Sequence, residues 1–328
     1  MGKVLFIVLF SLLFAGCVLW DDIDTLRERA RGREEPEIEL DYSEEGEEEV
    51  SEGEEEEQPP SPELNITIEM VFVPGGSFEL GREIGTDGEG DETPVSTVTL
   101  TGFHIGKYEV TQEQYQAVMG TNPSYFSSNP AAGETQGRRP VERVSWYDAI
   151  IFCNRLSMIE GLTPAYRING STDPAVWGAV PTAWLDPLII VWDAVEIVAG
   201  STGYRLPTEA QWEYAAKGGN NPPVGYTYSG SNNADEVAWY SSNSGNRTHE
   251  VGRLAPNSLG IYDMSGNVWE WCWDWCENDW LGVGVPSGSD RVLRGGNWYN
   301  DNIRSVLRGS IFVPNLRDDR VGFRLVRP

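Results

Sequence analysis

The C-terminal stretch 291–324 reads RVLRGGNWYNDNIRSVLRGSIFVPNLRDDRVGFR, and the interpretation of the whole chain depends on it. Both of its ends have the composition of a folded framework. A glycine pair permits a tight turn, and Trp298 and Phe323 each bring a large apolar side chain. The segment 299–320 between these ends mixes polar, aromatic and aliphatic residues with no strand or helix period. We therefore predict an irregular segment held at both ends, which is where a rigid scaffold commonly carries binding function.

The first 16 residues have the pattern of a bacterial signal peptide. Lys3 precedes an apolar run from Val4 to Phe14, which is too short to span a membrane comfortably. The sequence Ala15-Gly16-Cys17 then resembles a lipobox, whose cysteine becomes the lipidated first residue of the mature protein. We predict a lipoprotein anchored in the outer membrane or at the cell surface through Cys17. The alternative is a secreted protein that is cleaved near this point.

Residues 17–63 are predicted to form a lipidated N-terminus followed by a disordered acidic tether. The part from Asp21 to Glu63 holds 16 Glu and 4 Asp against 4 Arg, a net charge of −16. Such a segment has too little apolar surface to fold, and its charges repel one another. A spacer between membrane and domain is the favoured interpretation, and a binding site for a basic partner is the alternative.

The remaining residues, 64–328, are predicted to form a single domain. The whole chain has a formal net charge of −27, which argues against a nucleic-acid partner, and we expect a monomer. Only two histidines are present, too few for a zinc site of the usual kind. Apart from Cys17 the chain has Cys153, Cys272 and Cys276, so at most one disulfide can form among these three. We expect free thiols.

Three helices are predicted from a repeated start signal. Thr111–Gln114, Ser145–Asp148 and Thr208–Gln211 each place a hydroxyl three residues before a side-chain acceptor, which is the pattern of a capping box. Short strands are predicted from Met70 to Leu80 and over Val95–Val110, where apolar residues alternate or follow a Gly turn. The fold class is therefore α+β, with about three helices, short sheets and many loops.

Two long segments between these elements are harder to assign. Residues 163–203 are predicted to be an insertion with short strands, and 220–258 to be turn-rich without regular structure. After them, tryptophans at 269, 271, 273 and 275 alternate with Glu270, Cys272 and Asp274. A strand would place all four indoles on one face, so we predict an aromatic core wall. A sugar-stacking platform is the alternative, and it would need exposed rings.

Seven motifs in order resemble those of the formylglycine-generating enzyme family, also called sulfatase-modifying factors. They are FVPGGSF from Phe72, VTQEQY from Val110, PVERVSWYDA from Pro140, GYRLPTEAQWEYA from Gly203, NSLGIYDMSGNVWEW from Asn257, RGGNW from Arg294 and GFR from Gly322. The resemblance covers nearly all of residues 70–328. It implies a loop-rich domain with the C-type-lectin-like fold.

The resemblance does not extend to the family's chemistry. Oxidase members resemble one another in two cysteines shortly after the Arg-Gly-Gly element, and these bind copper. Here residues 299–320 contain no cysteine, and Asn300 stands at the first of the two positions. An amide cannot replace a thiolate as copper ligand or redox group. We therefore expect no copper and no catalysis.

The two framework ends also resemble those of the variable proteins of diversity-generating retroelements, including spirochaete lipoproteins. In those proteins adenines in codons such as AAC are randomised, which cannot yield Glu, Lys, Gln, Met or Trp. Residues 299–323 contain none of these five. This resemblance implies a variable region at about 294–324, which binds an unknown protein or glycan ligand. The implied diversified positions are Tyr299, Asn300, Asp301, Ile303, Ser305, Val306, Leu307, Gly309, Ser310, Ile311, Phe312, Val313, Leu316, Asp318 and Asp319.

Two alternatives remain open at this stage. The chain could instead be an undiversified, degenerate member of the enzyme family with a structural or accessory role in the cell envelope. The tripeptide Ile311-Phe312-Val313, an apolar hot spot if exposed, could equally be part of an ordinary buried strand.

The enzyme family also implies a structural calcium ion. The calcium site that members of that family share most often falls here on Asp263, Gly266, Val268 and Glu270. The acidic residues would supply carboxylate oxygens, and the other two would supply backbone carbonyls. Such hard oxygen ligands suit Ca²⁺. The alternative is that Glu270 pairs with an arginine inside the core.

Overall fold

The computed structural model describes residues 66–81, 96–183, 186–220, 226–276, 288–305 and 308–328, with only the course of the backbone at 308–311. The predicted signal peptide, Cys17 and the acidic tether lie outside the described residues. The described residues all fall within the unit Ser61–Pro328. None of their helices is long and apolar enough to cross a membrane.

Each of the three predicted capping boxes begins a helix. The helices are α2 (Gln112–Met119), α3 (Trp146–Ile159) and α5 (Glu209–Ala216), with N-caps Thr111, Ser145 and Thr208. In all three, the N-cap hydroxyl accepts from the backbone N–H three residues on, whose side chain accepts from the N-cap N–H. Two of the four unpaired amide groups of each helix start are thereby satisfied. These three helix predictions are confirmed.

Two small sheets form from the N-terminal strands and the C-terminus. β1 (Met70–Val73), β4 (Phe103–Gly106) and β11 (Val326–Arg327) make a sheet in the order β1-β4-β11, and β2 (Gly76–Leu80) pairs with β3 (Ser96–Leu100). The strand predicted over Val95–Val110 is therefore two strands in different sheets. At the break a Cβ on Gly75 would lie 2.7 Å from the carbonyl oxygen of Leu100, so only glycine fits there.

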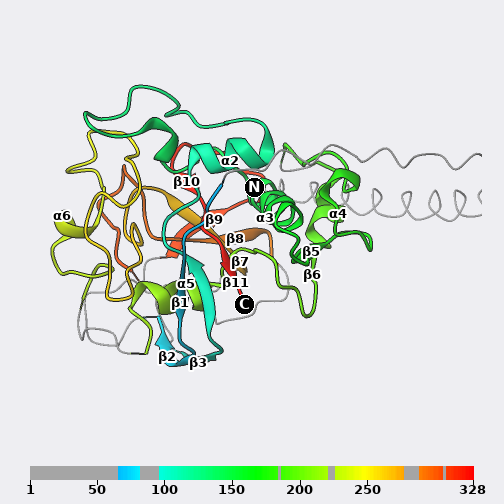
Figure 1. Ribbon diagram of the computed structural model, residues 1–328, viewed down its shortest axis with the longest axis horizontal. Helices are drawn as coiled ribbons and strands as arrows, with labels where there is room; N and C mark the ends of the chain where they lie inside the picture. The colour runs from blue at the N-terminus through cyan, green and yellow to red at the C-terminus, as the bar shows by residue number, and fades with distance from the viewer. Residues whose placement is uncertain (1–65, 82–95, 184–185, 221–225, 277–287, 306–307) are drawn as a thin grey trace, which may run out of the picture. The chain divides into compact units, whose positions relative to one another are not determined.

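The main sheet has the order β10-β7-β8-β9. Its strands are labelled in Figure 1. Its strands are β7 (Trp269–Cys276), β8 (Asp290–Arg294), β9 (Arg308–Phe312) and β10 (Val321–Gly322). β10 runs parallel to β7, and the other neighbours are antiparallel. The C-terminal stretch thus leaves the sheet at the end of β8, passes through β9 at one edge, and returns as β10 on the far side of β7.

Strand β7 separates two core clusters. Trp269 and Trp271 pack with α3 in one cluster, whereas Cys272 packs with α5 in the other. The Trp271 indole donates to the carbonyl oxygen of Val144 at 2.9 Å, and the Trp146 indole donates to that of Cys272 at 2.9 Å. Trp269 and Trp271 are buried, and the other two tryptophans are half-buried. The core-wall prediction is confirmed for Trp269, Trp271 and Trp273, whereas Trp275 lies beyond a register shift between β7 and β8 and is not part of the cluster. A sugar-stacking platform does not fit the buried rings.

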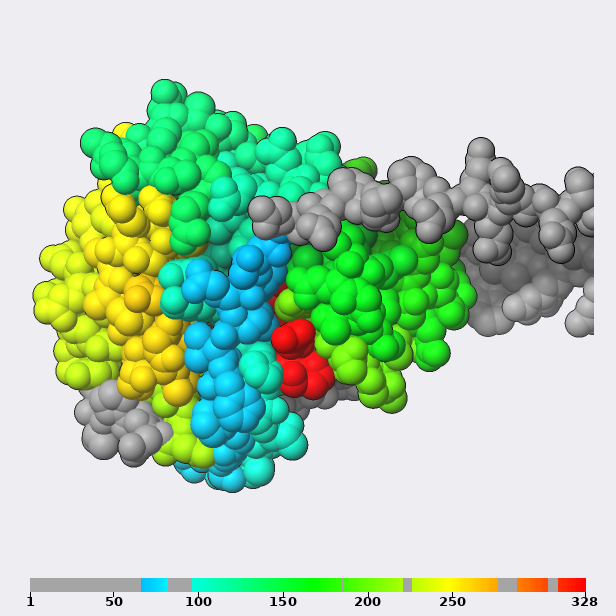
Figure 2. All heavy atoms as spheres, viewed as in Figure 1, coloured from blue at the N-terminus to red at the C-terminus, as the bar shows by residue number. Residues whose placement is uncertain are grey.

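The two segments that were hard to assign contain more structure than predicted. The insertion 163–203 has the paired strands β5 (Tyr166–Arg167) and β6 (Glu196–Ile197), but also a 3-10 turn, η3 (Pro174–Val176), and helix α4 (Ile189–Asp193). It forms the green surface on the right of Figure 2. Segment 220–258 carries the short helix α6 (Ala234–Val237), and η2 (Gln136–Arg138) precedes α3. Helices of four or five residues carry almost no periodic signal, which is why the sequence did not predict them.

Candidate functional site

The C-terminal stretch begins at a buried arginine. Arg294 ends β8 fully buried, and its guanidinium donates to the carboxylates of Glu209 (3.4 Å) and Glu213 on α5. The same guanidinium donates to the carbonyl oxygen of Ser305 at 3.1 Å. Arg294 therefore ties the sheet, a helix and the far end of the first loop together.

A tight turn follows, and it fixes the direction in which the stretch leaves the sheet. Gly296 has φ +80°, and a Cβ there would lie 2.6 Å from the side chain of Ile303. The next side chain, Asn297, accepts from the backbone N–H groups of Tyr299 (2.8 Å) and Asn300 (3.2 Å) through Oδ1. This local bonding holds the first residues of the stretch in one conformation.

Both framework aromatics are anchored as predicted. The backbone N–H of Trp298 donates to the carbonyl oxygen of Asn267 at 2.9 Å, and its indole donates to that of Asp319 at 3.1 Å. Phe323 is fully buried in the α3 cluster, edge-on to the Phe152 ring at 5.3 Å. The beginning and end of the stretch are therefore bonded to each other as well as to the body.

The side chains between these anchors differ in exposure. Tyr299, with 57% of its surface exposed, and Asp301 are open to solvent. Several other predicted positions are half-buried: Asn300, Phe312, Val313, Leu316, Asp318 and Asp319. Phe312 and Leu316 pack against the α3 cluster, so Phe312 behaves as a strand residue and not as an exposed hot spot. Val306 and Leu307 lie outside the described residues, and only the backbone of Gly309, Ser310 and Ile311 is described, in β9.

Two of the predicted contact positions need correction because their side chains are buried. Ile303 is 0% exposed and packs with Val237 and Ala238. Ser305 is 4% exposed, and its backbone N–H donates to the carbonyl oxygen of Thr227 at 3.2 Å. Neither side chain can touch a ligand on the surface. A segment without a period gives no sign of which of its residues face inward, so sequence reasoning could not separate these two from Tyr299.

Sequence reasoning also missed an aromatic row beside the stretch. The Tyr125, Phe126, Trp298 and Tyr299 rings follow one another in edge-to-face contacts at 5.0, 5.2 and 5.5 Å. The two end residues, Tyr125 and Tyr299, are each 57% exposed. The row therefore joins the start of the C-terminal stretch to a loop that lies far from it in sequence, and presents a tyrosine from each.

Glu142 and Arg143 support the loop that carries Tyr125. The buried Glu142 carboxylate accepts from the backbone N–H groups of Tyr125 (2.9 Å) and Phe126 (2.8 Å). Burial raises the pKa of Glu142 to about 7, although these two hydrogen bonds act in the opposite direction. The exposed Arg143 has φ +60°, rare for a residue with a side chain, and its guanidinium lies 4.8 Å from the Tyr125 ring centre. Strained backbone of this kind is more frequent at functional sites than elsewhere, so Arg143 is a signal that only the structure could supply.

The residues predicted to bind calcium lie in a buried charged group beneath this surface. Glu270 is bonded through both carboxylate oxygens to Arg324, and Oδ2 of Asp263 accepts from the backbone N–H of Gly252 at 2.7 Å. Glu109 lies nearby and accepts from the side chain of Asn267 and the backbone of Val268. Burial raises the pKa of Asp263 to about 6 and that of Glu109 well above its usual range.

This arrangement fits the ion-pair alternative better than a calcium ion. Glu270 already has a cationic partner on both oxygens. In the part of the chain that the structure describes, no three His, Cys, Asp or Glu side chains gather in a metal-binding group. Calcium at Asp263, Gly266, Val268 and Glu270 remains an untested prediction.

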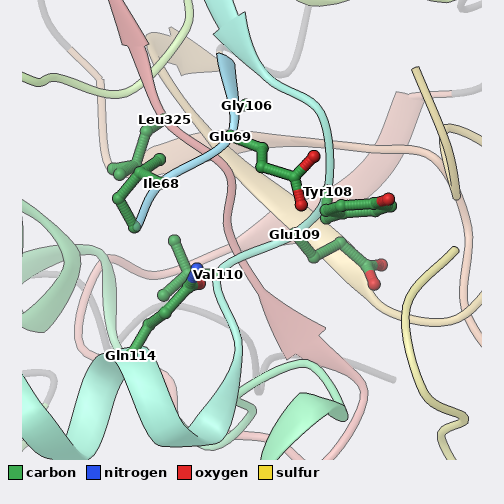
Figure 3. Close-up of a pocket in the computed structure, with 8 residues that line it drawn as sticks. All are labelled: Ile68, Glu69, Gly106, Tyr108, Glu109, Val110, Gln114 and Leu325. Carbon is green, nitrogen blue, oxygen red and sulfur yellow. The ribbon is translucent and has the colours of Figure 1, made fainter. Parts of the chain in front are cut away.

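A small hollow elsewhere on the domain takes no part in this surface (Figure 3). It is lined by Ile68, Glu69, Gly106, Tyr108, Glu109, Val110, Gln114 and Leu325. The Glu109 carboxylate extends away from the apolar side chains Ile68, Val110 and Leu325 that face the hollow. None of these lining residues is among the predicted ligand-contact positions.

The comparison with family models decides which family the chain is in. Residues 55–328 match the sulfatase-modifying factor enzyme 1-like domain. The chain belongs to the sulfatase-modifying factor family. The predicted family and fold class are therefore confirmed, with an α+β, loop-rich domain of the C-type-lectin-like kind.

Three relatives place the protein within that family. The solved structure of Treponema denticola variable protein 1 is similar at 42% identity and a TM-score of 0.66, over 79% of this chain and 95% of that one. The chaperone protein LppX of Paenibacillus barcinonensis is 41% identical over 280 residues, which is 80% of this chain and 90% of the relative. The formylglycine-generating enzyme of Thermomonospora curvata is 29% identical over 303 residues, covering 78% of this chain and 92% of the enzyme. The sulfatase-modifying factor family thus includes both enzymes and a protein named for its variability.

The cysteines of this sulfatase-modifying factor homologue lie away from the position where the family's oxidases carry theirs. Asn300, where the resemblance predicts the first of the oxidases' cysteines, accepts through its backbone carbonyl oxygen from the backbone N–H of Ser241 at 3.3 Å. Cys153 on α3 and Cys272 on β7 are buried free thiols in separate core clusters. Burial raises the pKa of both thiols, so they stay protonated and unreactive.

Proposed function

We propose that the protein is a surface-displayed lipoprotein that binds a protein or glycan ligand through its diversified C-terminal stretch and catalyses no reaction. One observation carries the proposal most strongly. Tyr299 is exposed while the residues on either side of the loop, Trp298 and Ile303, are buried and bonded into the body. The loop can therefore present changing side chains from a fixed support.

The composition and the similarity support the same function. Tyrosine, asparagine and serine give adaptable contacts at a low cost in side-chain entropy, as in antibody loops. The likeness to Treponema denticola variable protein 1 spans 95% of that chain at 42% identity, which supports a similar scaffold. Asn300 at the expected cysteine position, together with the buried neutral thiols of Cys153 and Cys272, supports the absence of oxidase chemistry.

The DNA sequence downstream of the coding region tests the diversification. We expect a near-identical repeat of the 294–324 codons that differs at adenines, next to a reverse transcriptase gene. The codons that differ should include those for Tyr299 and Asp301. A downstream region without such a repeat contradicts diversification.

A second candidate is an undiversified accessory protein of the cell envelope, favoured by the 41% identity to a relative named as a chaperone protein. On this alternative the downstream repeat is missing, and the purified chain slows the aggregation of an unfolded secreted protein. Residual oxidase activity is tested separately, with copper and a cysteine-containing sulfatase peptide. Formation of formylglycine would contradict the non-catalytic function.

The membrane anchor is tested by substitution of the lipobox cysteine. We expect Cys17→Ser to move the protein from the membrane fraction to the soluble fraction, since one acyl-modified residue supplies the anchor. Cys153→Ser is the matched control, because Cys153 is buried in the domain and has no part in anchoring. Unchanged membrane fractionation of the Cys17 variant would contradict lipidation at this position.

A further inference from the structure

His249 lies behind the start of the C-terminal stretch with a hydrogen-bond acceptor at each ring nitrogen. Nδ1 is 2.7 Å from Oε1 of Glu134, and Nε2 is 2.7 Å from the carbonyl oxygen of Ser244. The side chains of His249 and Glu134 are only 7% and 4% exposed, so water does not replace either contact. The ring is held between two loops that are distant in sequence.

The two acceptors determine how many protons the His249 ring must carry to form both hydrogen bonds. A carbonyl oxygen carries no proton, so Nε2 must donate to Ser244. An ionised carboxylate carries none either, so Nδ1 must donate to Glu134. With Glu134 ionised, both bonds exist together only when the ring is a doubly protonated imidazolium. The Trp239 indole stacks on the ring at 3.8 Å with an interplanar angle of 17°, an arrangement that favours a cationic ring.

Ser244 connects His249 to the proposed binding stretch, residues 298–301. The Ser244 hydroxyl donates to the carbonyl oxygen of Trp298 at 2.7 Å. In the same loop, Ser241 donates its backbone N–H to the carbonyl oxygen of Asn300 at 3.3 Å, and its hydroxyl bonds the Asp301 carboxylate. Loop 241–244 therefore hydrogen bonds to residues 298–301, and His249 in turn hydrogen bonds to the loop at Ser244.

Other charged groups surround this contact without hydrogen bonding to the ring. Glu250 donates its backbone N–H to Oε2 of Glu134, and its carboxylate pairs with Arg138 at 3.1 Å and Arg253 at 4.0 Å. Arg139 donates to the Thr248 hydroxyl next to the histidine, and Arg247 lies in the same turn.

One further carboxylate reaches the histidine only indirectly. Glu109 accepts from the side chain of Asn267, whose own oxygen accepts from the backbone N–H of His249. Among the described residues, Glu134 is thus the ionisable group bonded to the imidazole.

We propose that His249 is a proton-controlled positioning residue, which holds the binding stretch at 298–301 in place while it is protonated and releases loop 241–244 when it is not. The relevance to ligand binding rests on the function proposed above. When the ring loses a proton, the remaining one stays on Nδ1, because the carboxylate of Glu134 is a stronger acceptor than a carbonyl. The Nε2 lone pair then faces the carbonyl oxygen of Ser244, and that contact becomes repulsive.

Hydrogen exchange of the full chain at two pH values tests this. The readouts are the protection factors of the Ser241 and Ser244 amides, corrected for the intrinsic effect of pH. We expect protection to fall roughly tenfold between pH about 5.5 and about 8, as expected for losing one buried charge-assisted bond. The Trp298 amide, which donates to Asn267 outside the loop, should keep its protection.

The chain supplies a matched control, because His104 is its only other histidine. His104→Gln should keep the pH dependence, and His249→Gln should abolish it, since glutamine does not titrate in this range. An equal pH dependence in His249→Gln, or none in the wild type, would overturn the proposal.

A second measurement keeps the proposal testable if His249→Gln does not fold. Ring ¹⁵N chemical shifts of the wild-type chain should report a doubly protonated His249 at the lower pH and an Nδ1–H tautomer at the higher one. An Nε2–H tautomer at the higher pH would contradict the proposed release. Neither readout needs a ligand, so failure here is distinguishable from failure of ligand binding at Tyr299.

Discussion

Arg324 and Glu270 form a two-point ion pair in the centre of the domain. Nε of Arg324 lies 2.6 Å from Oε2 of Glu270 and Nη2 lies 2.7 Å from Oε1, with both side chains fully buried. The Trp212 indole also donates to the Glu270 carboxylate, at 2.7 Å. The pair connects β7 to the chain just after β10, where the C-terminal stretch returns to the sheet.

We expect Glu270→Gln to destabilise the domain by about 3–5 kcal/mol, because it leaves the Arg324 charge buried without its partner. The measurement is the free energy of unfolding in urea. Glu69→Gln is the matched control: Glu69 pairs with Lys107 at 2.9 Å on the surface, and such pairs contribute about 0–1 kcal/mol. Similar losses of unfolding free energy in the two variants would show that the buried pair contributes no more to stability than the surface pair.

How much of the structure the sequence predicts depends on how local the signal is. The capping boxes at Thr111, Ser145 and Thr208 act within one helical turn, so the sequence alone identified all three helices. The tryptophan alternation in β7 is equally local. The row from Tyr125 to Tyr299 forms between segments far apart in the chain, and no periodic pattern links them.

The difference between local signals and long-range contacts also explains which parts of the candidate site the sequence could predict. The framework at Trp298 and Phe323 was predictable because large apolar rings contribute strongly to cores and the nearby glycines indicate tight backbone turns. The burial of Ile303 follows instead from its contact with α6, a helix too short to be predicted. Glu270 and Arg324 lie 54 residues apart, so the sequence could offer a buried arginine partner for Glu270 only as an alternative, without saying which arginine it is.

A pair of substitutions in the binding stretch should separate its contact positions from its structural ones. We expect Ile303→Ala to cost about 2–5 kcal/mol of stability, because it leaves a cavity in a closed cluster. Tyr299→Ala should change stability by no more than about 0.5 kcal/mol, since this residue is largely in solvent. Urea unfolding of both variants provides the measurement. A large loss for Tyr299→Ala would place that side chain in the core and remove it from the proposed surface.

Stability should fall as the pH rises through neutrality. The pKa of Glu142 is raised from 4.5 to about 7 by burial, so the folded state holds its proton more tightly than the unfolded chain does. The stability that comes from this proton is fully present below about 4.5 and is lost as the pH rises through about 7. Its size is at most about 3.5 kcal/mol, because the pKa rises from 4.5 to about 7 and each pKa unit corresponds to about 1.4 kcal/mol.

The Glu142→Gln variant tests whether Glu142 causes this pH dependence of stability. The variant should lose less stability than the wild type between pH about 5 and about 8, measured by urea unfolding at each pH. Some slope should remain, because burial also raises the pKa values of Asp263 and Asp274 to about 6. An identical slope in the variant and the wild type would assign the pH dependence to other groups.

Chelation distinguishes the two interpretations of the group around Glu270. A structural calcium ion bound at Asp263, Gly266, Val268 and Glu270 would stabilise the folded state by mass action, so its removal would lower the melting temperature. Because both oxygens of Glu270 already bond to Arg324, we expect EDTA to leave the melting temperature unchanged. A fall of several degrees that is reversed by Ca²⁺ but not by Mg²⁺ would contradict this expectation. In that case, Glu270 would have to bind the ion through its remaining lone pairs, and Asp263→Asn should weaken the response to Ca²⁺.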